Sequence, residues 1–286
     1  MTFYLTALIS GLCLSLMALG IFISMKIFRI PDITTDGSYT LGAVVTAIVL
    51  TLHWPVALTI PVVILAGAIA GALTGIIHTR FKIDALLAGI LVMTGLYSIN
   101  LTLLGRSNLP LLDIAGIFNW LPQSTVTDLL ICVVFAGVIA IVIGYILKTD
   151  FGIAMRATGN SPTMSKASGI NVNRMKIIGL SIANALTALS GFLMSQYQGF
   201  TDINMGIGIV IVGLGAVLIG DALISLLKVN RLWLQLAAVM LGSILFQLVL
   251  AFTLSIGVDP NLLKLVTAIF VLAIVAIPAL KLKRTA

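Results

Sequence analysis

Residues 126–147 are VTDLLICVVFAGVIAIVIGYIL, a run whose single charged residue is Asp128. A helix needs about 20 predominantly apolar residues to cross the hydrocarbon core of a bilayer. This run is long enough and apolar enough, so it predicts a membrane-spanning helix rather than an element of a soluble domain.

Eight further apolar runs flank it, four on each side. They are Phe3–Met25, Gly37–Trp54, Pro55–His78, Asp84–Leu104, Ile177–Gln198, Ile203–Leu227, Leu232–Phe252 and Leu262–Leu280. Together the runs predict an all-α polytopic membrane protein with about nine transmembrane helices, forming one transmembrane domain over residues 1–286. The second run opens with polar side chains, and we expect that helix to be broken or re-entrant.

The composition agrees with a membrane protein. The chain has 286 residues, of which 60% are hydrophobic and 9% charged, and its mean hydropathy is +1.22. A soluble domain carries roughly 25% charged residues, so this chain could not cover a water-facing surface. That excludes a soluble enzyme, a nucleic-acid-binding domain and a disordered protein.

Basic residues orient the predicted helices. Placing the N-terminus outside and the C-terminus inside puts fourteen of the 16 Lys and Arg residues on the cytoplasmic side. They are Lys26, Arg29, Arg80, Lys82, Lys148, Arg156, Lys166, Arg174, Lys176, Lys228, Arg231, Lys281, Lys283 and Arg284, and only Arg106 and Lys264 remain outside. Cytoplasmic loops carry an excess of Lys and Arg, so this split predicts that orientation and an odd number of spans.

The segment from Pro31 to Gly42 places polar residues at the start of the second run. Thr35 or Asp36 can cap the helix, which leaves a positive dipole end and unpaired backbone N–H groups near membrane depth. Two interpretations stay open, a capped helix start at the interface and a broken helix that lines a translocation path.

Other polar residues inside the runs are few. They are Tyr97, Ser98, Asn100, Asn184, Gln235 and Gln247. Such side chains either bridge helices or face a substrate path. Asp221 is the one acid late in a run, and we expect it to cap a helix, to pair with Lys228 or Arg231, or to relay protons.

Two parts of the sequence share a short pattern. Asp32-Ile33 precedes Leu41-Gly42-Ala43-Val44, and Asp202-Ile203 precedes Leu214-Gly215-Ala216-Val217. The predicted topology places the first Asp-Ile pair inside and the second outside, as inverted repeats of transporters would have it. The two spacings differ, so chance similarity stays an alternative.

The cytoplasmic loop at about residues 149–176 predicts two short helices. Asp150 can cap the first and Gly159 can end it. Ser161 can cap the second, Pro162 fits its first turn, and Gly169 fits the position after its end. A helix of two turns is not stable alone, so it must dock on the protein's own spans or on a cytoplasmic partner.

The sequence has no motif that supplies chemistry. It lacks the Gly-x4-Gly-Lys-Ser/Thr phosphate-binding loop, and it has no His-x-x-x-His or Cys-x-x-Cys pair. Cys13 and Cys132 lie in separate apolar runs, and we interpret both as buried small residues rather than a disulfide. We therefore expect no catalytic residue, no metal site and no cofactor in this chain.

Four stretches resemble the permease subunits of ATP-binding-cassette importers of the branched-chain amino acid and ribose class, nearest the subgroup for tryptophan and tyrosine uptake. They are Phe28–Ala43, Tyr97–Asn100 with Asn108–Pro110, Arg156–Gly169, and Gln196–Phe200 with Met205–Gly208. One departure is Asp221, where relatives are expected to have Glu. The chain has no Glu, so its loop also lacks the Glu-Ala-Ala signature of many importer permeases.

The resemblance implies a homodimer in a bacterial inner or plasma membrane, surrounded by lipid and with no nucleic-acid partner. It implies two further partners, a cytoplasmic ATPase that holds ATP and Mg²⁺ and an extracytoplasmic substrate-binding protein. It also makes residues 161–169 the helix that couples to the ATPase. The predicted coupling residues are Arg156, Ser161, Pro162, Met164, Lys166, Ala167 and Gly169.

The resulting hypothesis is a conduit for a small solute, with an aromatic amino acid favoured by the resemblance alone. The predicted pathway residues are Asp36, Ser38, Tyr39, Thr40, Tyr97, Asn100 and Asn184. The alternatives are an ion-gradient-driven secondary transporter, an importer permease for a sugar or nucleoside, and a polytopic membrane enzyme. A secondary transporter would need intramembrane acids, for which only Asp221 and Asp36 qualify.

Overall fold

A computed structural model of the protein describes residues 2–111, 116–119, 124–227, 231–259 and 262–283. The structure is 83% helical, which confirms the all-α class. Its α-helices are α1 (Thr2–Ile21), α2 (Thr34–Thr51), α3 (Val56–Arg80), α4 (Ala85–Leu104), α5 (Thr125–Lys148), α6 (Asp150–Asn160), α7 (Pro162–Ala167), α8 (Val172–Gln198), α9 (Ile209–Leu227), α10 (Leu232–Ser255) and α11 (Leu263–Lys283). A π-helix, η1 (Phe22–Ile27), continues α1, and η2 (Ile117–Asn119) is a 3₁₀ turn.

Seven helices among the described residues are long and apolar enough to cross a membrane. They are α1 together with η1, α3, α4, α5, α8, α9 and α10. The count of nine expected from the sequence also included α2 and α11. The described part of α11 contributes a shorter apolar stretch, Leu263–Ile274.

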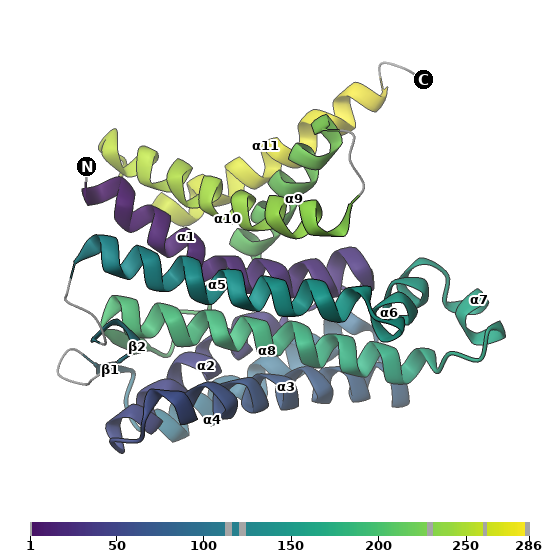
Figure 1. The fold of residues 1–286 in the computed structure, drawn as a ribbon, viewed down its shortest axis with the longest axis horizontal. Helices are drawn as coiled ribbons and strands as arrows, with labels where there is room; N and C mark the ends of the chain where they lie inside the picture. The colour runs from purple at the N-terminus through teal and green to yellow at the C-terminus, as the bar shows by residue number, and fades with distance from the viewer. Residues whose placement is uncertain (1, 112–115, 120–123, 228–230, 260–261, 284–286) are drawn as a thin grey trace.

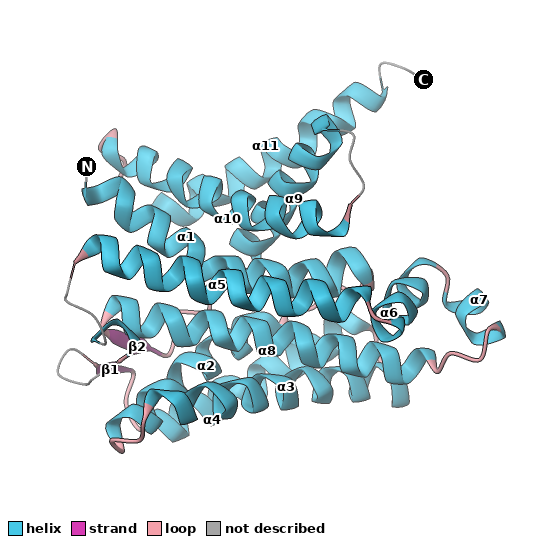
Figure 2. Ribbon diagram, in the orientation of Figure 1, coloured by secondary structure: helices cyan, strands magenta, loops and turns pink. Residues whose placement is uncertain are grey.

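The long helices run side by side, with distinct features at the two ends of the bundle (Figure 1). A two-stranded antiparallel ribbon of β1 (Asn108–Pro110) and β2 (Phe200–Asp202) lies at one end, and it pairs Leu109 with Thr201. The helices α6 and α7 lie at the other end (Figure 2). We refer to these as the ribbon end and the α7 end.

Glycines let α3 pack closely on the central helix α8. The sequence places Gly67, Gly71 and Gly75 on one face of α3, and all three meet α8 backbone atoms. A Cβ at Gly75 would lie 2.7 Å from the Cα of Ile177, closer than side-chain contacts allow. The small-residue face is therefore a packing face, as in other membrane helix pairs.

The chain reverses between α1 and α2. After η1, Arg29 adopts a left-handed backbone with φ of 56°, and the chain enters the bundle without helical structure until Thr34. The expected cap of α2 by Thr35 or Asp36 is wrong, because the helix starts earlier, at Thr34. Asp32 Oδ1 instead accepts a hydrogen bond of 2.9 Å from the Thr34 backbone N–H, a turn that orders the helix entry.

A second non-helical segment precedes α9. The expected helix start at Ile203 is wrong, because β2 and a series of turns occupy residues 200–208 and α9 begins at Ile209. Asp202 Oδ1 accepts from the Asn204 backbone N–H at 2.8 Å, the same local bond that Asp32 makes. The chain thus enters α2 from the α7 end and α9 from the ribbon end, as inverted repeats would.

The structure corrects the predicted start and end of α6. Thr149, not Asp150, caps α6 through its side chain, and Gly159 lies inside the helix rather than after it. Gly159 is there because a Cβ would collide with the Ile27 carbonyl oxygen. The second helix follows the prediction, with Ser161 as its cap, Pro162 in its first turn and Gly169 left-handed at φ 81° after its end.

The two cysteines lie together in the core, which the sequence could not show. The Sγ atoms of Cys13 on α1 and Cys132 on α5 are 3.6 Å apart, and both are free and buried. We expect a membrane-permeant oxidant to join them, and mass spectrometry of peptides should detect a Cys13–Cys132 disulfide. Failure to form it in folded protein, while a denatured sample oxidises, would contradict the α1–α5 packing.

A polar junction inside the helix bundle

Asp36 joins the starts of two helices. It lies in the first turn of α2, and its side chain is 8% exposed. Its two carboxylate oxygens accept hydrogen bonds of 2.9 Å from the backbone N–H groups of Gly208 and Val210, where α9 begins. A carboxylate at a helix N-terminus satisfies unpaired N–H donors and complements the positive end of the helix dipole. Asp36 therefore caps α9, a helix far away in the sequence.

A buried hydrogen-bond network anchors the entry to α2. The amide of Asn184 on α8 donates to Asp32 Oδ2 at 2.7 Å, and its oxygen accepts from the Ser38 hydroxyl at 2.7 Å. Thr34 and Thr74 share a hydrogen bond of 2.7 Å between α2 and α3. All five side chains are buried. Because buried polar groups are costly when unpaired, this network fixes the depth at which α2 starts.

A cavity of about 470 Å³ opens beside this junction. Tyr39, which is 2% exposed, and Met205 and Ile209 from the start of α9 line it. The remaining lining residues are Ser10, Leu14, Met194, Gln198, Phe200, Asp202, Asn204 and Gln247. The cavity combines apolar walls with several amide and hydroxyl groups, the usual character of a small-solute site.

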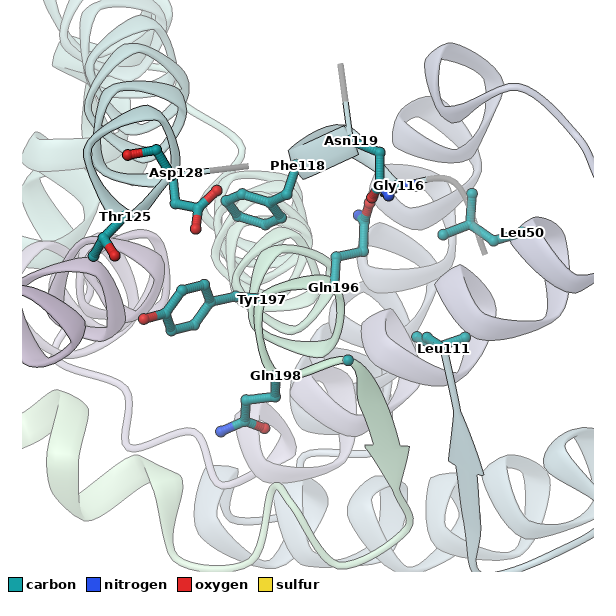
Figure 3. A pocket seen from close by; sticks show the side chains of 12 residues that line it. Leu50, Leu111, Gly116, Phe118, Asn119, Thr125, Asp128, Gln196, Tyr197 and Gln198 are labelled. Atoms are coloured by element: carbon teal, nitrogen blue, oxygen red, sulfur yellow. Dashed lines mark hydrogen bonds between the residues drawn. The ribbon is translucent and has the colours of Figure 1, made fainter. Parts of the chain in front are cut away.

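A second cavity of about 370 Å³ lies at the ribbon end (Figure 3). Asp128 on α5 and Tyr197 on α8 lie on two sides of it, and Phe118 of η2 lies nearby. The rings of Phe118 and Tyr197 are 5.8 Å apart between centroids. Gln198 lines both cavities, so the C-terminal end of α8 separates two polar hollows at this end of the molecule.

Most of the predicted pathway residues gather at the junction. Thr40 bonds the Asp36 carbonyl oxygen at 3.2 Å and lies against Gly206. The amide of Asn100 donates to the Gly37 carbonyl oxygen at 3.3 Å, while its own oxygen is buried without a protein partner. With Ser38, Tyr39 and Asn184 described above, these side chains lie on the first turns of α2 or pack against them.

Tyr97 does not join this group. It lies on α4 and is 44% exposed, whereas the junction side chains are buried. Asp32, Met205, Ile209 and Gly208, by contrast, belong to the junction but were absent from the predicted pathway. An Asp two residues before a helix start is a recognisable turn signal, so Asp32 was detectable, whereas the other three lie near Asp36 only through the tertiary fold.

The predicted coupling residues lie at the α7 end. Ser161 caps α7 by accepting from the Met164 backbone N–H at 3.4 Å, and Met164 is 72% exposed. Pro162, Lys166, Ala167 and Gly169 are exposed around it, and Arg156 is exposed on the preceding helix α6. The short helix thus presents a mostly uncovered surface.

Asp221 pairs with a residue that the sequence did not suggest. Its Oδ2 lies 2.6 Å from the Lys26 Nζ, which ties α9 to η1. The predicted partner Arg231 makes no ion pair with any residue that the structure describes, and Lys228 lies outside the described residues. Within the described residues, no group of three or more His, Cys, Asp or Glu could hold a metal ion.

Comparison with known proteins decides the family. The sequence model of the branched-chain amino acid transport system permease component matches residues 3–275. The chain belongs to this family. Members are permeases of ATP-binding-cassette transporters, and this member is a multi-pass bacterial membrane protein.

Relatives within the family have different named substrates. The tyrosine transport system permease protein of Clostridioides difficile is 40% identical over 272 residues, 95% of this chain and 90% of the relative. The ribose import permease protein RbsC of Haemophilus influenzae is 26% identical over 66% of this chain and 59% of its own length. The probable branched-chain amino acid transport permease protein LivH of Methanocaldococcus jannaschii is 26% identical over 67% and 65%. No solved structure matches the chain significantly.

Proposed function

We propose that this family member is the membrane-spanning permease subunit of an ATP-binding-cassette importer for a small solute. A separate cytoplasmic ATPase supplies the energy and holds ATP and Mg²⁺. An extracytoplasmic binding protein delivers the solute at the ribbon end, and two copies of the permease form the conduit. The chain itself performs no catalysis.

The observation that carries this proposal is the short helix α7. It has six residues, a serine cap and a left-handed glycine after its end. Its residue Met164 is largely uncovered. A helix this short gains little stability by itself, so an exposed apolar surface on it favours docking into a partner. We assign this role to Ser161, Pro162, Met164, Lys166, Ala167 and Gly169, together with Arg156 on α6.

The proposed arrangement in the membrane has nine crossings, with the N-terminus outside and the C-terminus inside. It adds α2 and α11 to the seven long apolar helices. The α7 end then faces the cytoplasm and carries most of the basic residues, as the positive-inside rule requires. In this arrangement α2 and α9 each start within the bilayer after a non-helical entry, so both are broken spans, and their N-terminal ends meet at Asp36.

The state of the two candidate acids disfavours a gradient-driven transporter. Asp36 is engaged by two backbone N–H groups and Asp221 by Lys26. An acid that couples a proton or cation gradient must exchange partners during transport. Here the carboxylates are already occupied by structural bonds, which is consistent with energy from a separate ATPase.

The proposed substrate is an amino acid, with an aromatic one favoured. The support is the named substrate of the 40% identical relative, together with the ring-lined cavities at Tyr39 and at Phe118 and Tyr197. A sugar or nucleoside is the alternative, because a ribose permease is among the relatives. The pathway would run past Asp36, Ser38, Tyr39, Thr40, Asn100 and Asn184, and the exposed Tyr97 would face it from a second copy.

The coupling role of α7 is testable with paired substitutions. We expect Ser161→Ala with Gly169→Ala to weaken association with the co-expressed ATPase of a neighbouring gene at least tenfold. The cap contributes about 1 kcal/mol, and a left-handed non-glycine residue costs roughly 1–2 kcal/mol. Their sum is enough to melt a six-residue helix. The measurements are the amount of ATPase that co-purifies with the permease and the uptake of substrate by the complete transporter.

A matched control exists at the opposite end. Ser124 caps α5 and Gly105 ends α4 with φ of 66°, so Ser124→Ala with Gly105→Ala makes the same chemical changes at the ribbon end. This control should keep ATPase association. Equal association of both double variants with the ATPase would remove the coupling role of α7.

A further inference from the structure

A cationic cavity of about 200 Å³ lies at the α7 end, apart from the junction. Three basic residues line it, and they come from three different segments. Lys26 belongs to η1, Arg29 to the turn that follows, and Arg156 to α6. Its other walls are Phe22, Ile27, Asn160, Leu232 and Gln235. The fold thus gathers charges that are up to 130 positions apart in the sequence.

The described part of the chain neutralises only one of the three positive charges of this cavity. Lys26 is paired with Asp221 at 2.6 Å. Neither Arg29 nor Arg156 has a carboxylate within ion-pair distance in the described part of the chain. Two guanidinium groups therefore remain available, each with a planar fork of N–H donors suited to phosphate oxygens. The amides of Asn160 and Gln235 add further hydrogen-bond donors.

The backbone that presents Arg29 is unfavourable for arginine. Its φ of 56° lies in the left-handed region, which glycine adopts without cost and arginine does not. The π-helix η1 immediately precedes it, and such turns occur frequently at functional sites. The bonds Phe28 N–H to Ile23 O and Ile30 N–H to Ser24 O hold this conformation on both sides. These two backbone bonds therefore hold Arg29 in a strained turn at the edge of the cavity.

The cavity lies where lipid headgroups are found. It is formed at the ends of long apolar helices, with Leu232 as the first residue of α10. The neighbouring Trp233 is partly exposed, and the Lys148 Nζ lies 5.3 Å from its ring centroid. Trp and Lys side chains of this kind mark the membrane–water interface, and basic pockets between helices on the cytoplasmic side bind anionic headgroups.

We propose that Lys26, Arg29 and Arg156 form a binding site for a phosphate group, supplied either by the headgroup of an anionic phospholipid or by free phosphate. The bound group would bridge η1 and α6 and so hold α6, and the α7 that follows it, against the bundle. The site does not depend on the proposed transport function, but its place on the cytoplasmic side rests on the proposed orientation in the membrane.

The test uses the full chain purified into nanodiscs. The thermal unfolding midpoint is measured in phosphatidylglycerol, in phosphatidylcholine, and in phosphatidylcholine with inorganic phosphate, with chloride keeping the ionic strength equal. We expect one phosphate source to raise the midpoint of the unaltered chain. For Arg29→Gly, we expect that at least tenfold more of the phosphate source is needed for the same rise in midpoint. In phosphatidylcholine alone, the midpoint of this variant should be equal or higher, because the backbone strain is relieved. Arg156→Gln should weaken the response similarly.

Lys82→Gly is the matched control. Lys82 is also exposed and left-handed, with φ of 54°, but it lies in the α3–α4 turn and does not line the cavity. It should retain the full response. A response only to phosphatidylglycerol supports a lipid source, and a response to inorganic phosphate supports a free anion. Equal loss in Lys82→Gly, no response to either source, or a response that needs an added acidic protein partner would overturn the proposal.

Discussion

Replacing Gly42 by Ala should prevent the close crossing of α2 and α8 and destabilise the protein by about 2 kcal/mol or more. A Cβ at Gly42 would collide with the carbonyl oxygen of Ala188 and lie 2.6 Å from its Cα. Gly191 on α8 makes the reciprocal approach to the Tyr39 carbonyl oxygen. Both contacts are with backbone atoms, which cannot move aside as a flexible side chain can. The helices must therefore separate, and the buried network at Asn184 opens with them.

The measurement is the fraction of protein that stays monodisperse in detergent after heating. Gly137→Ala on α5 is the control, because a Cβ there meets nothing within 4 Å. That variant should be neutral or more stable by up to about 1 kcal/mol, since Ala favours helix over Gly. If the Gly42 and Gly137 variants kept the same fraction of monodisperse protein after heating, α2 and α8 would not cross at Gly42.

Replacing Asp36 by Ala should abolish uptake while leaving insertion and ATPase association intact. The change leaves the Gly208 and Val210 N–H groups without their acceptor. A hydrogen bond to a charged group contributes about 1.5–3 kcal/mol, so the start of α9 should fray and the junction with α2 open. Asp36→Asn should be nearly as damaging, because Gly208 and Val210 donate to different carboxylate oxygens, and Asn would replace one of these acceptors with an NH₂ donor that faces a backbone N–H.

Asp84→Asn is the control for this prediction. Asp84 also caps a helix, accepting from the Leu86 backbone N–H at 2.9 Å, but it does so at the exposed start of α4. Asn is as good a cap as Asp in that setting, so uptake should be unchanged. Uptake is measured with labelled amino acid in cells that contain the complete transporter. Near-normal uptake by Asp36→Asn would show that the α2–α9 junction is dispensable for transport.

The helices that depend on local signals were predictable. Most of the long helices follow from apolar runs that needed no knowledge of their neighbours. The caps at Ser161 and Asp84, and the glycines at 105 and 169, also act within a few residues of where they lie. The α7 boundaries were therefore accessible before the fold was known.

Features set by distant contacts were not predictable. Asp36 is in the right place to cap its own helix, and only the tertiary fold shows that it caps α9. Gly159 resembles a helix-ending glycine, yet it lies within α6 because the Ile27 carbonyl passes close by. The pairing of Lys26 with Asp221, and the meeting of Cys13 with Cys132, likewise join residues far apart in the chain.

The sequence by itself determined that this protein is a helical membrane protein, because hydropathy and short-range capping act through neighbouring residues. The tertiary structure alone decided which polar groups meet inside it. A buried carboxylate or amide must find a partner wherever the packing of helices provides one. The depth of α2, the start of α9 and the cationic cavity at Arg29 and Arg156 are consequences of that packing.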